Sequence, residues 1–583
     1  MTINNDNNTN KQKIFKDPVY GYISVPYDFV DTFIDSPVFQ RLRRIVQTSY
    51  SPLYPTALHN RFVHSLGVYH LGSLAFENIK KTFKEAIQGK ETSGFPVDDY
   101  ERLFLVACLL HDVGHAPFSH IGEKFYETIP GKESFVDQFW EAAGVETKYR
   151  PSDPRKETAA PHEIMSVLVA LRVFDSFFKD KDKEFFARCI TGYEYDVSQY
   201  DAKLKYQYQL KNCLIPILKS DLIDVDRLDY LIRDSFVSGY QNVSIDYKRL
   251  LSNLMVVYDK NEEKFILAFH KNAVSIIESV IFAHDSEKKW IQNHPVICYE
   301  AEIIKYAIRK VIAYFGSKNI FCKEALTEEG VVVNTKPPIT EKEFKISLLS
   351  DSEILFFIKY LAYNDEFLNE FFDRTKRRYA LWKSEFEFTH LYISKLSGDE
   401  SKSSMSVWKS ITKVFEGILS YIPPVINDKA LSEAENILIN YMPGKLVYDE
   451  EIDDNRRIEQ EKGIQEFIEY CKCFKKFAQK NKLDFNKGFL ILMPKKFTSN
   501  FTKEKTDKIK IWFSTAQKVD AFTDVTSTLT STPPAESKKQ LEKEKFVYFY
   551  IQKINDDSRK RKIQDKFISF VGNELKTAHD KLN

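Results

Sequence analysis

The first half of the chain places its apolar side chains mostly at helical spacing. Ser36 followed by Pro37 predicts the start of a helix, because serine caps helix ends and proline suits the first turn. The same spacing predicts helices over 62–81 and 100–113. Alternation with a period of two, the mark of a half-buried strand, is scarce as far as about residue 310. We therefore expect an all-helical core.

The last part of the chain has a different pattern. The stretches GFLILMPKKF, KIKIWFST and KFVYFYIQK are typical of strands, and they accompany a helical stretch over 464–480. A Ser-rich stretch lies just before this part and is typical of a linker. The predicted fold is mainly α, with a smaller C-terminal α+β appendage. The predicted division is a flexible tail over 1–12, a core with a helical extension over 13–395, a linker over 396–407 and a region of unknown role over 408–583.

Composition narrows the class of protein. The 84 Lys and Arg nearly balance the 83 Asp and Glu, so no overall field directs the chain to nucleic acid or to a membrane. No apolar run approaches the roughly 20 residues that span a bilayer. Seven scattered cysteines and a polar N-terminus without an apolar signal segment favour a cytoplasmic protein with reduced thiols.

A His-Asp pair ends the most apolar predicted helix. His111 and Asp112 follow LFLVACLL, so they lie in or beside a core, where an unpartnered carboxylate costs several kcal/mol. An isolated pair of this kind is most simply explained as a buried hydrogen-bonded pair. This pair, however, begins the motif HDVGHAPFSH, whose glycine and proline turn the chain and bring His115 and His120 back towards it.

Two other segments supply matching ligand types. His64 lies near the start of a helix in HNRFVHSLG. Asp226, Tyr230 and Asp234 recur every four residues in a later helix, beside Arg227; alone, that stripe would equally fit a solvated, salt-bridged face. Two imidazoles and two carboxylates suit one divalent ion such as Mn, Fe, Zn or Mg, which would activate water and polarise a phosphoryl group.

These motifs together resemble a known superfamily. The order H…HD…D matches the HD-domain phosphohydrolases, and more specifically the deoxynucleoside triphosphate (dNTP) triphosphohydrolases, including the type with an added sterile-alpha-motif domain. The resemblance is carried by DPVYGYISV, DSPVFQRLRRIVQ, HNRFVHSLG, LLHDVGHAPFSH, PHE and DVDRLDYLIRDSFVSGYQN. It covers residues 13–310, and more weakly extends to about 395. It implies that the predicted helical core is an HD domain.

The resemblance also implies residue roles. The implied metal ligands are His64, His111, Asp112 and Asp226. The implied catalytic residues are His115 and His162, with Glu123 orienting His162 where relatives carry Asp. The residues implied to hold the triphosphate are Arg61, His120, Arg227 and Tyr230, and those implied to meet the sugar 3′-hydroxyl are Gln47 and Asp234. Water attack at the α-phosphorus would release a deoxynucleoside and inorganic triphosphate.

Two features limit the resemblance. Vertebrate-type enzymes carry a phosphate-binding arginine after the D-Y-K-R segment, whereas ESVIFAHDSEKKWIQNHPV has none here; Ala283 and His284 cannot replace it bidentately, and Lys288, Lys289, Trp290 or His294 would have to substitute. Selectivity between deoxy- and ribonucleotides is therefore open. Asp35, Gln40 and Arg43 match positions that bind an activating nucleotide in some relatives, although an exposed helix face explains them equally. A homo-oligomer is implied by the family alone.

Two other functions remain open at this stage. The first is an HD-type nuclease or phosphodiesterase acting on nucleic acid, supported by the missing arginine and by Lys- and aromatic-rich stretches such as YCKCFKKFAQKNK. Solvated lysine-rich surface explains such stretches more simply. The second is a nucleotide-binding regulatory module without catalysis, against which the complete set of metal-ligand types argues.

Overall fold

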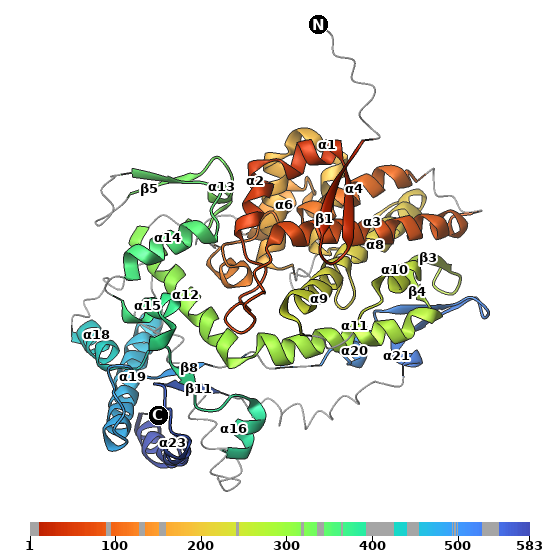
Figure 1. Cartoon of the computed structure of the whole chain (residues 1–583). Coiled ribbons are helices and arrows are strands. Elements are labelled where there is room, and N and C mark those ends of the chain that lie inside the picture. Colours follow the sequence, from red (N-terminus) through yellow and green to blue (C-terminus); the bar gives the residue numbers. More distant parts are fainter. Residues whose placement is uncertain are drawn as a thin grey trace. The chain divides into compact units, whose positions relative to one another are not determined.

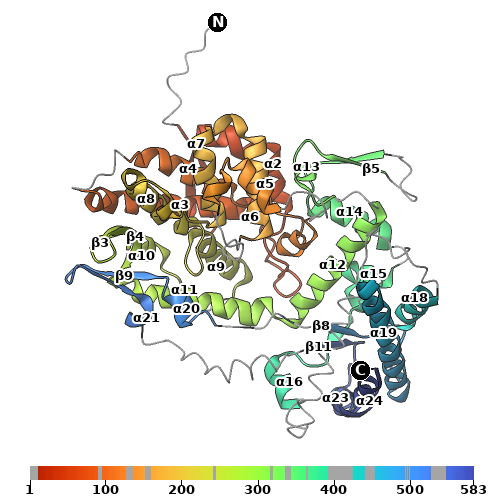
Figure 2. The same ribbon diagram turned by 180° about the vertical axis from the view of Figure 1, so that it is seen from behind.

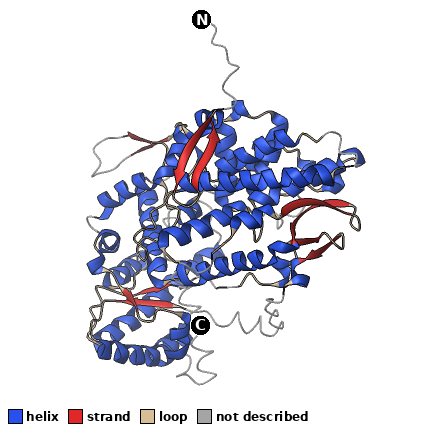
Figure 3. Cartoon of the chain, turned by 45° about the vertical axis from the view of Figure 1, so that its right-hand side comes forward, coloured by secondary structure: helices blue, strands red, loops and turns tan. Residues whose placement is uncertain are grey.

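The computed structural model describes most of the chain, and helices dominate it (Figure 3). The described residues are 11–88, 95–126, 135–150, 159–240, 244–315, 320–334, 343–362, 365–391, 425–439, 454–492, 494, 497, 499–526 and 547–582. The mainly α class predicted from the sequence is confirmed. The chain forms two compact units, each built from separate stretches of sequence. Unit 1 contains 1–288, 311–357 and 498–532, and unit 2 contains 289–310, 358–497 and 533–583.

Unit 1 holds every residue that the sequence analysis assigned to metal, substrate or catalysis. Its helices, labelled in Figure 1, are α1 (Tyr27–Phe29), α2 (Pro37–Arg41), α3 (Arg61–Ala86), α4 (Val97–Leu110), α5 (Phe135–Ala142), α6 (Pro161–Val173), α7 (Asp180–Thr191), α8 (Ala202–Leu218), α9 (Val225–Ser238), α10 (Tyr247–Ser252), α11 (Val274–Glu287), α13 (Lys323–Leu326), α20 (Lys503–Thr506) and α21 (Phe522–Val525). Residues of α12 (Pro295–Phe315) and α14 (Asp351–Leu361) are divided between the two units.

The long helix α3 organises the core of unit 1. It packs against α4 and α9, and its buried side chains include Leu66, Val68 and Leu71. The predicted start of α2 is confirmed, because the Ser36 hydroxyl accepts a hydrogen bond from the backbone N–H of Phe39 and Pro37 occupies the first turn. The packing of α3 against α4 brings His64 close to His111, which directly follows α4.

Short strands supplement the helices of unit 1. The sheet pairings are a hairpin of β1 (Gln12–Asp17) and β2 (Gly21–Pro26), a hairpin of β5 (Val331–Asn334) and β6 (Glu343–Ile346), and a sheet in the order β10-β9-β4-β3. The last sheet contains β3 (Leu254–Asp259), β4 (Lys264–His270), β9 (Lys510–Phe513) and β10 (Lys518–Ala521). Strand β9 pairs in parallel with β4, so the C-terminal segment 499–526 is built into unit 1. Figure 2 shows this blue segment beside α11.

Unit 2 combines helices with one small sheet. Its helices are α15 (Glu366–Phe372), α16 (Glu385–Leu391), α18 (Asp428–Ile439), α19 (Asp454–Lys480), α23 (Asp557–Phe570) and α24 (Lys576–Leu582). Its sheet has the order β7-β11-β8, formed by β7 (Tyr379–Ala380), β11 (Tyr548–Ile551) and β8 (Leu490–Leu492). The predicted linker 396–407 lies outside the described residues, and the domain division drawn from the sequence stays a prediction.

Two further observations concern cysteines and membranes. All seven cysteines are free thiols, each buried or half-buried. Within the part of the chain that the structure describes, no helix is both long and apolar enough to cross a bilayer. The cytoplasmic location inferred from the sequence stays a prediction.

Candidate metal centre and active site

Three helix ends bring the predicted metal ligands together. His64 lies in the first turns of α3, which begins after Asn60 caps it through the backbone N–H of Val63. His111 directly follows the last residue of α4, and Asp226 lies in the first turn of α9, which Asp224 caps. Side-chain caps thus fix the two helix starts that carry His64 and Asp226.

The ligand atoms converge within the distances that one small ion requires. The Nε2 atom of His64 lies 3.1 Å from Asp226 Oδ1 and 3.3 Å from His111 Nε2. The distance from His111 Nε2 to Asp226 Oδ1 is 3.8 Å. Ligand atoms that share one divalent ion at bond lengths near 2.1 Å lie about 3 Å apart. His64, His111 and Asp226 therefore form a group that could hold a metal ion.

Hydrogen bonds on the far side of both imidazoles favour metal binding. The Nδ1 atom of His64 lies 2.7 Å from Asp229 Oδ2, and Nδ1 of His111 lies 2.9 Å from the carbonyl oxygen of Cys108. In the neutral form of each ring, these acceptors keep the hydrogen on Nδ1, which leaves the Nε2 lone pair facing the centre. Two lone pairs 3.3 Å apart repel unless a cation lies between them, so the donor set fits a divalent metal.

Asp229 is a functional candidate that the sequence analysis missed. It lies one turn after Asp226 and is completely buried, and Arg233 donates to both of its oxygens. Burial raises the pKa of Asp229, but Arg233 and His64 outweigh that effect and lower it to about 2. The side chain fits because Gly67 of α3 has no Cβ, which would overlap the Asp229 carboxylate. The D-x-x-D spacing was the available signal.

Asp112 lies beside the three ligand atoms. Its Oδ1 atom is 3.3 Å from His111 Nε2, and its Oδ2 atom is 3.6 Å from His64 Nε2. Burial raises the pKa of Asp112, but Arg61, His111 and His64 lower it well below its usual range. Arg61 donates to Asp112 Oδ2 at 2.8 Å and to the Ser119 hydroxyl at 2.9 Å. Arg61 is thus a buried partner of the predicted metal ligand Asp112.

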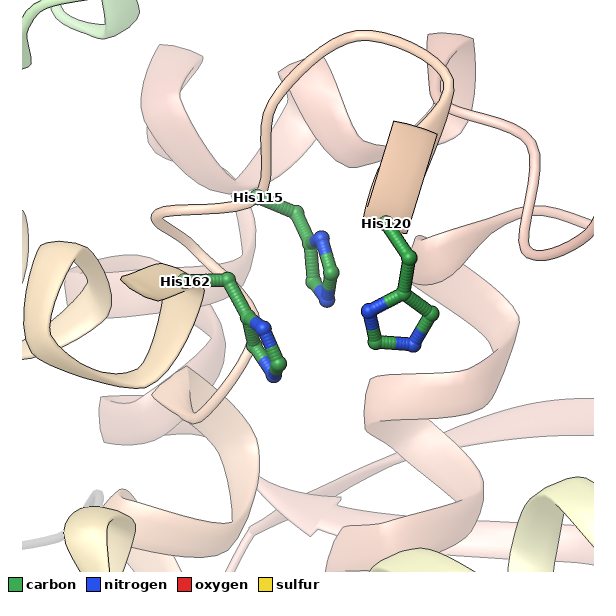
Figure 4. A group of neighbouring side chains, drawn as sticks. All are labelled: His115, His120 and His162. Atoms are coloured by element: carbon green, nitrogen blue, oxygen red, sulfur yellow. The ribbon is translucent and has the colours of Figure 1, made fainter. Parts of the chain in front are cut away.

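A second group of histidines lies next to the first. The imidazoles of His115, His120 and His162 approach one another from the HDVGHAPFSH loop and the start of α6 (Figure 4). His115 and His162 are stacked, with ring centroids 4.1 Å apart and an interplanar angle of 17°. His115 also connects the two groups, because its Nε2 atom lies 3.4 Å from Asp112 Oδ1. The candidate metal ligands and the three further imidazoles therefore meet at the contact between Asp112 and His115.

The loop that carries these histidines is tightly held. A Cβ on Gly114 would collide with the α6 backbone at Met165 and Ser166, so glycine is needed for this close approach. Arg41, which is buried, donates to the carbonyl oxygens of His115, Val113 and Leu349. The loop is thus held by its close packing against α6 and by the hydrogen bonds from Arg41.

Glu123 connects two of the three imidazoles. Its Oε2 atom lies 2.5 Å from His162 Nδ1, and its Oε1 atom lies 3.0 Å from His120 Nδ1. Burial raises the pKa of Glu123, but hydrogen bonds from both histidines lower it well below its usual range. Burial lowers the pKa of His162, but Glu123 outweighs this effect and raises it. The expected contact between Glu123 and His162 is present.

His115 has the opposite electrostatic environment. Burial and the nearby cationic side chain of Arg61 lower its pKa well below the usual value. Neither of its ring nitrogens makes a hydrogen bond with the described residues. The environment therefore keeps His115 neutral beside His162, whose environment favours the protonated form. Opposite pKa shifts in two neighbouring titratable groups are typical of acid–base sites.

Three of the predicted substrate residues, Arg227, Tyr230 and Asp234, lie on α9 together with Asp226. Gln47 is buried, and its Oε1 atom has no hydrogen-bond partner among the described residues. Asp234 Oδ1 lies 2.7 Å from Nε2 of His59, a residue that the sequence analysis did not single out within HNRFVHSLG. The Arg227 Nε atom donates to the Tyr230 hydroxyl at 3.3 Å. The unpartnered oxygen of Gln47 makes it available to a ligand.

The three predicted regulatory residues also lie together. Arg43 donates from Nε to Gln40 Oε1 at 2.8 Å, and its guanidinium carbon lies 3.5 Å from the Phe62 ring centroid. Asp35 is exposed and pairs with Lys13 at 3.6 Å. Arg43 and Gln40 thus contact each other, whereas Asp35 pairs with Lys13, and a regulatory role stays a prediction.

Comparison with known proteins identifies a known domain within unit 1. The model of the HD domain matches residues 61–167, which include all the histidines of both groups. A relative from Dictyostelium discoideum, named deoxynucleoside triphosphate triphosphohydrolase SAMHD1 homolog, is 29% identical over 42% of this chain and 40% of its own length. The Gallus gallus deoxynucleoside triphosphate triphosphohydrolase SAMHD1 is 31% identical over 46% of this chain and 40% of its own.

Other relatives have no assigned activity. The uncharacterized protein MG461 of Mycoplasma genitalium is 26% identical over 58% of this chain and 69% of its own length. The crystal structure of a hypothetical protein from Aquifex aeolicus shares the fold at a TM-score of 0.50 and 17% identity, over 96% of this chain and all of that one. This chain thus spans about two fifths of the length of the named triphosphohydrolases. The chain carries an HD domain, and it resembles the dNTP triphosphohydrolases at modest identity.

Proposed function

We propose that this protein is a metal-dependent phosphohydrolase that converts a dNTP into the deoxynucleoside and inorganic triphosphate. The observation that carries the proposal is the contact between the two histidine groups. The group that fits a metal and the group that includes Glu123 are joined through Asp112 and His115, whose atoms lie 3.4 Å apart. The names of the relatives support the choice of a dNTP as substrate.

His64, His111, Asp112 and Asp226 would hold the metal in this proposal. A divalent ion bound there supplies Lewis acidity towards a phosphoryl oxygen and lowers the pKa of a coordinated water. The residues of the chain provide the remaining functions. Asp229 and the Cys108 carbonyl orient the two imidazoles, and Arg61 keeps Asp112 ionised.

Proton transfer falls to the imidazoles around Glu123. Attack of water on the α-phosphorus forms one P–O bond and breaks the bond to the 5′ oxygen, which must gain a proton to leave as a hydroxyl. His162 and His120 both contact Glu123, so either imidazole that donates a proton remains connected to the other through this carboxylate. Neutral His115 lies between them and the metal ligands, where it can accept a hydrogen bond from water.

Substrate binding is assigned to Gln47, to His120 and to three residues that share α9 with Asp226. Arg227, Tyr230 and His120 would contact the phosphates, while Gln47 and Asp234 would contact the sugar. Gln47 supports this role because its buried side-chain oxygen has no hydrogen-bond partner among the described residues. The side chain of Arg61 is held by Asp112 and Ser119, so we assign it first to holding Asp112 and only through that residue to the substrate.

Product analysis tests the proposal. The protein would be incubated with Mn²⁺ and each dNTP or NTP, singly and in mixtures, so that a nucleotide activator is also present. We expect inorganic triphosphate and nucleoside in equal amounts, and neither product from a His111→Ala/Asp112→Ala variant. Absence of triphosphate in every mixture would contradict the proposal. Single-stranded DNA and RNA would then be tested, since cleavage lost in the same variant would support the nuclease alternative.

A further inference from the structure

A C-terminal segment that begins at Ser499 packs in unit 1, although it is far in sequence from the candidate site residues. Asn500 precedes α20 in the C-terminal segment of unit 1 and is buried against α11. Its backbone N–H donates to the carboxylate of Asp285 at 3.0 Å, and the Ser499 hydroxyl donates to the same carboxylate at 2.5 Å. Figures 1 and 2 both show α20 next to α11. Asp285 therefore anchors this segment to the helix that follows β4.

This anchor fixes the hydrogen bonding of His284. The Asn500 Nδ2 atom donates to Asp285 Oδ1 at 2.7 Å, which determines the orientation of the amide because a carboxylate only accepts. The same Nδ2 atom lies 2.5 Å from His284 Nδ1, so Nδ1 must be the acceptor and Nε2 must carry the hydrogen. Burial, Arg227, Lys288 and Lys505 lower the pKa of His284 to about 3, which keeps this tautomer neutral.

The Nε2–H group of His284 is available to a ligand. No described residue forms a hydrogen bond with it, and the His284 ring is only half-buried. The ring centroid lies 6.4 Å from that of Tyr230, whose hydroxyl accepts from Arg227. His284 therefore connects the C-terminal segment with two residues assigned to the phosphates.

A lysine of the C-terminal segment completes this arrangement. Lys505 of α20 donates from Nζ to Asn500 Oδ1 at 2.5 Å, and its charge is close enough to influence His284. The positive charges of Arg227 and Lys505 thus both act on the neutral His284 donor. A triphosphate carries about four negative charges, and such a mixture of cations and an N–H donor suits its outer phosphates.

We propose that His284 and Lys505 bind the outer phosphates of the nucleoside triphosphate, so that the segment around Asn500 completes the substrate site. This inference rests on the proposed function. It answers the question raised by the missing arginine in ESVIFAHDSEKKWIQNHPV, because a donor and a charge from two separate elements replace one guanidinium. Asn500 and Asp285 act as positioning residues.

The test is the binding of inorganic tripolyphosphate to the 583-residue chain, measured by calorimetry in the presence of Mn²⁺. This measurement does not depend on catalysis. Lys505→Gln is expected to weaken binding roughly tenfold, the effect of losing one charge-assisted contact. The matched control is Lys503→Gln, which removes the same charge from an exposed position of the same short helix and should leave the affinity unchanged.

His284 is tested by two substitutions. His284→Ala should weaken tripolyphosphate binding by a similar factor, while His284→Gln, which can still present an N–H donor, should restore part of it. Equal affinities for wild type and Lys505→Gln, or no binding by the wild type, would overturn the inference. Failure of the proposed function looks different, because tripolyphosphate would then bind and respond to Lys505→Gln while no dNTP is hydrolysed.

A kinetic comparison adds a second readout. For a dNTP, Lys505→Gln should raise KM roughly tenfold and change kcat by less than about twofold, as for an interaction made equally with bound substrate and transition state. Bis(p-nitrophenyl) phosphate has no outer phosphates, so its hydrolysis by the same variant should match that of wild type. Equal losses with both substrates would indicate damage to the fold and would contradict the assignment.

Discussion

The Nδ1 atom of His64 lies 2.7 Å from the Oδ2 atom of Asp229, on the side of the imidazole opposite the candidate metal centre. This pair determines which nitrogen of His64 is available as a ligand. Arg233 in turn holds Asp229, and Asp17 accepts a hydrogen bond from Arg233 at 2.8 Å. The orientation of a ligand on α3 therefore depends on a buried chain of charges that begins in β1.

The substitution Asp229→Asn should weaken metal binding. The amide oxygen can still accept a hydrogen bond from His64. The substitution nevertheless removes the negative charge that makes the imidazole a better metal ligand, and it leaves the Arg233 guanidinium facing a neutral group. Loss of such outer partners typically costs 10- to 100-fold in affinity. Competition between the protein and a chromogenic chelator for Mn²⁺ would measure the change. Asp180→Asn, at an exposed residue of α7, is the control, and equal affinities for both variants would contradict this role.

The substitution Glu123→Gln should shift the pH dependence of kcat. Glu123 raises the pKa of His162, so the imidazolium persists to higher pH than it would alone. If proton donation by this pair is required, activity falls as the pH rises through that pKa. Removing the carboxylate lowers the pKa, and the alkaline limb of the profile should move to lower pH. A lower maximal kcat with no shift of the profile along the pH axis would show that Glu123 only positions the loop.

The buried carboxyl of Asp351 should make stability depend on pH. Burial raises its pKa to about 7, although the backbone N–H groups of Val46 and Phe118 donate to it. The folded state then binds the proton more tightly than the unfolded chain, so this contribution to stability is complete below about pH 4 and is lost as the pH rises to about 7. Relative to Asp351→Asn, the wild-type free energy of unfolding should fall by up to about 4 kcal/mol over this range. Urea denaturation at several pH values would measure it, and a constant difference would contradict the shift.

The substitution Arg41→Met should destabilise unit 1. The buried guanidinium donates to three backbone carbonyls around the HDVGHAPFSH loop, and methionine would leave them without these donors. Each lost partner costs about 1 kcal/mol or more, so we expect a loss of about 3 kcal/mol in urea denaturation. Arg44→Met, three residues beyond the end of α2 and exposed, is the matched control. Equal stabilities of the two variants would show that the carbonyls find other donors.

The sequence predicted the parts of the site that follow from local patterns. Apolar spacing located α3 and α4, and the change from apolar residues to His111 and Asp112 marked the end of α4. Long-range partners were not predictable in this way. Asp229 became a candidate only when α9 was seen packed against Gly67 of α3, because the D-x-x-D spacing alone does not tell a buried carboxylate from an exposed one.

The C-terminal segment illustrates the same limit for the fold. KIKIWFST predicted a strand, and β9 lies within it. One of its two neighbours in the sheet is β4, more than 200 residues earlier, and no periodicity within either strand encodes that pairing. The contact between Asn500 and His284 likewise joins residues far apart in the sequence, so the sequence analysis could note the missing arginine but could not link His284 with this segment.

The position of the oxygen taken from water tests the proposed reaction most directly. Hydrolysis of a dNTP in water enriched in ¹⁸O, with mass spectrometry of both products, reports which bond is formed and which is broken. Attack at the α-phosphorus predicts one ¹⁸O atom in inorganic triphosphate and none in the deoxynucleoside. Label in the deoxynucleoside, or release of pyrophosphate or orthophosphate in place of triphosphate, would contradict the account.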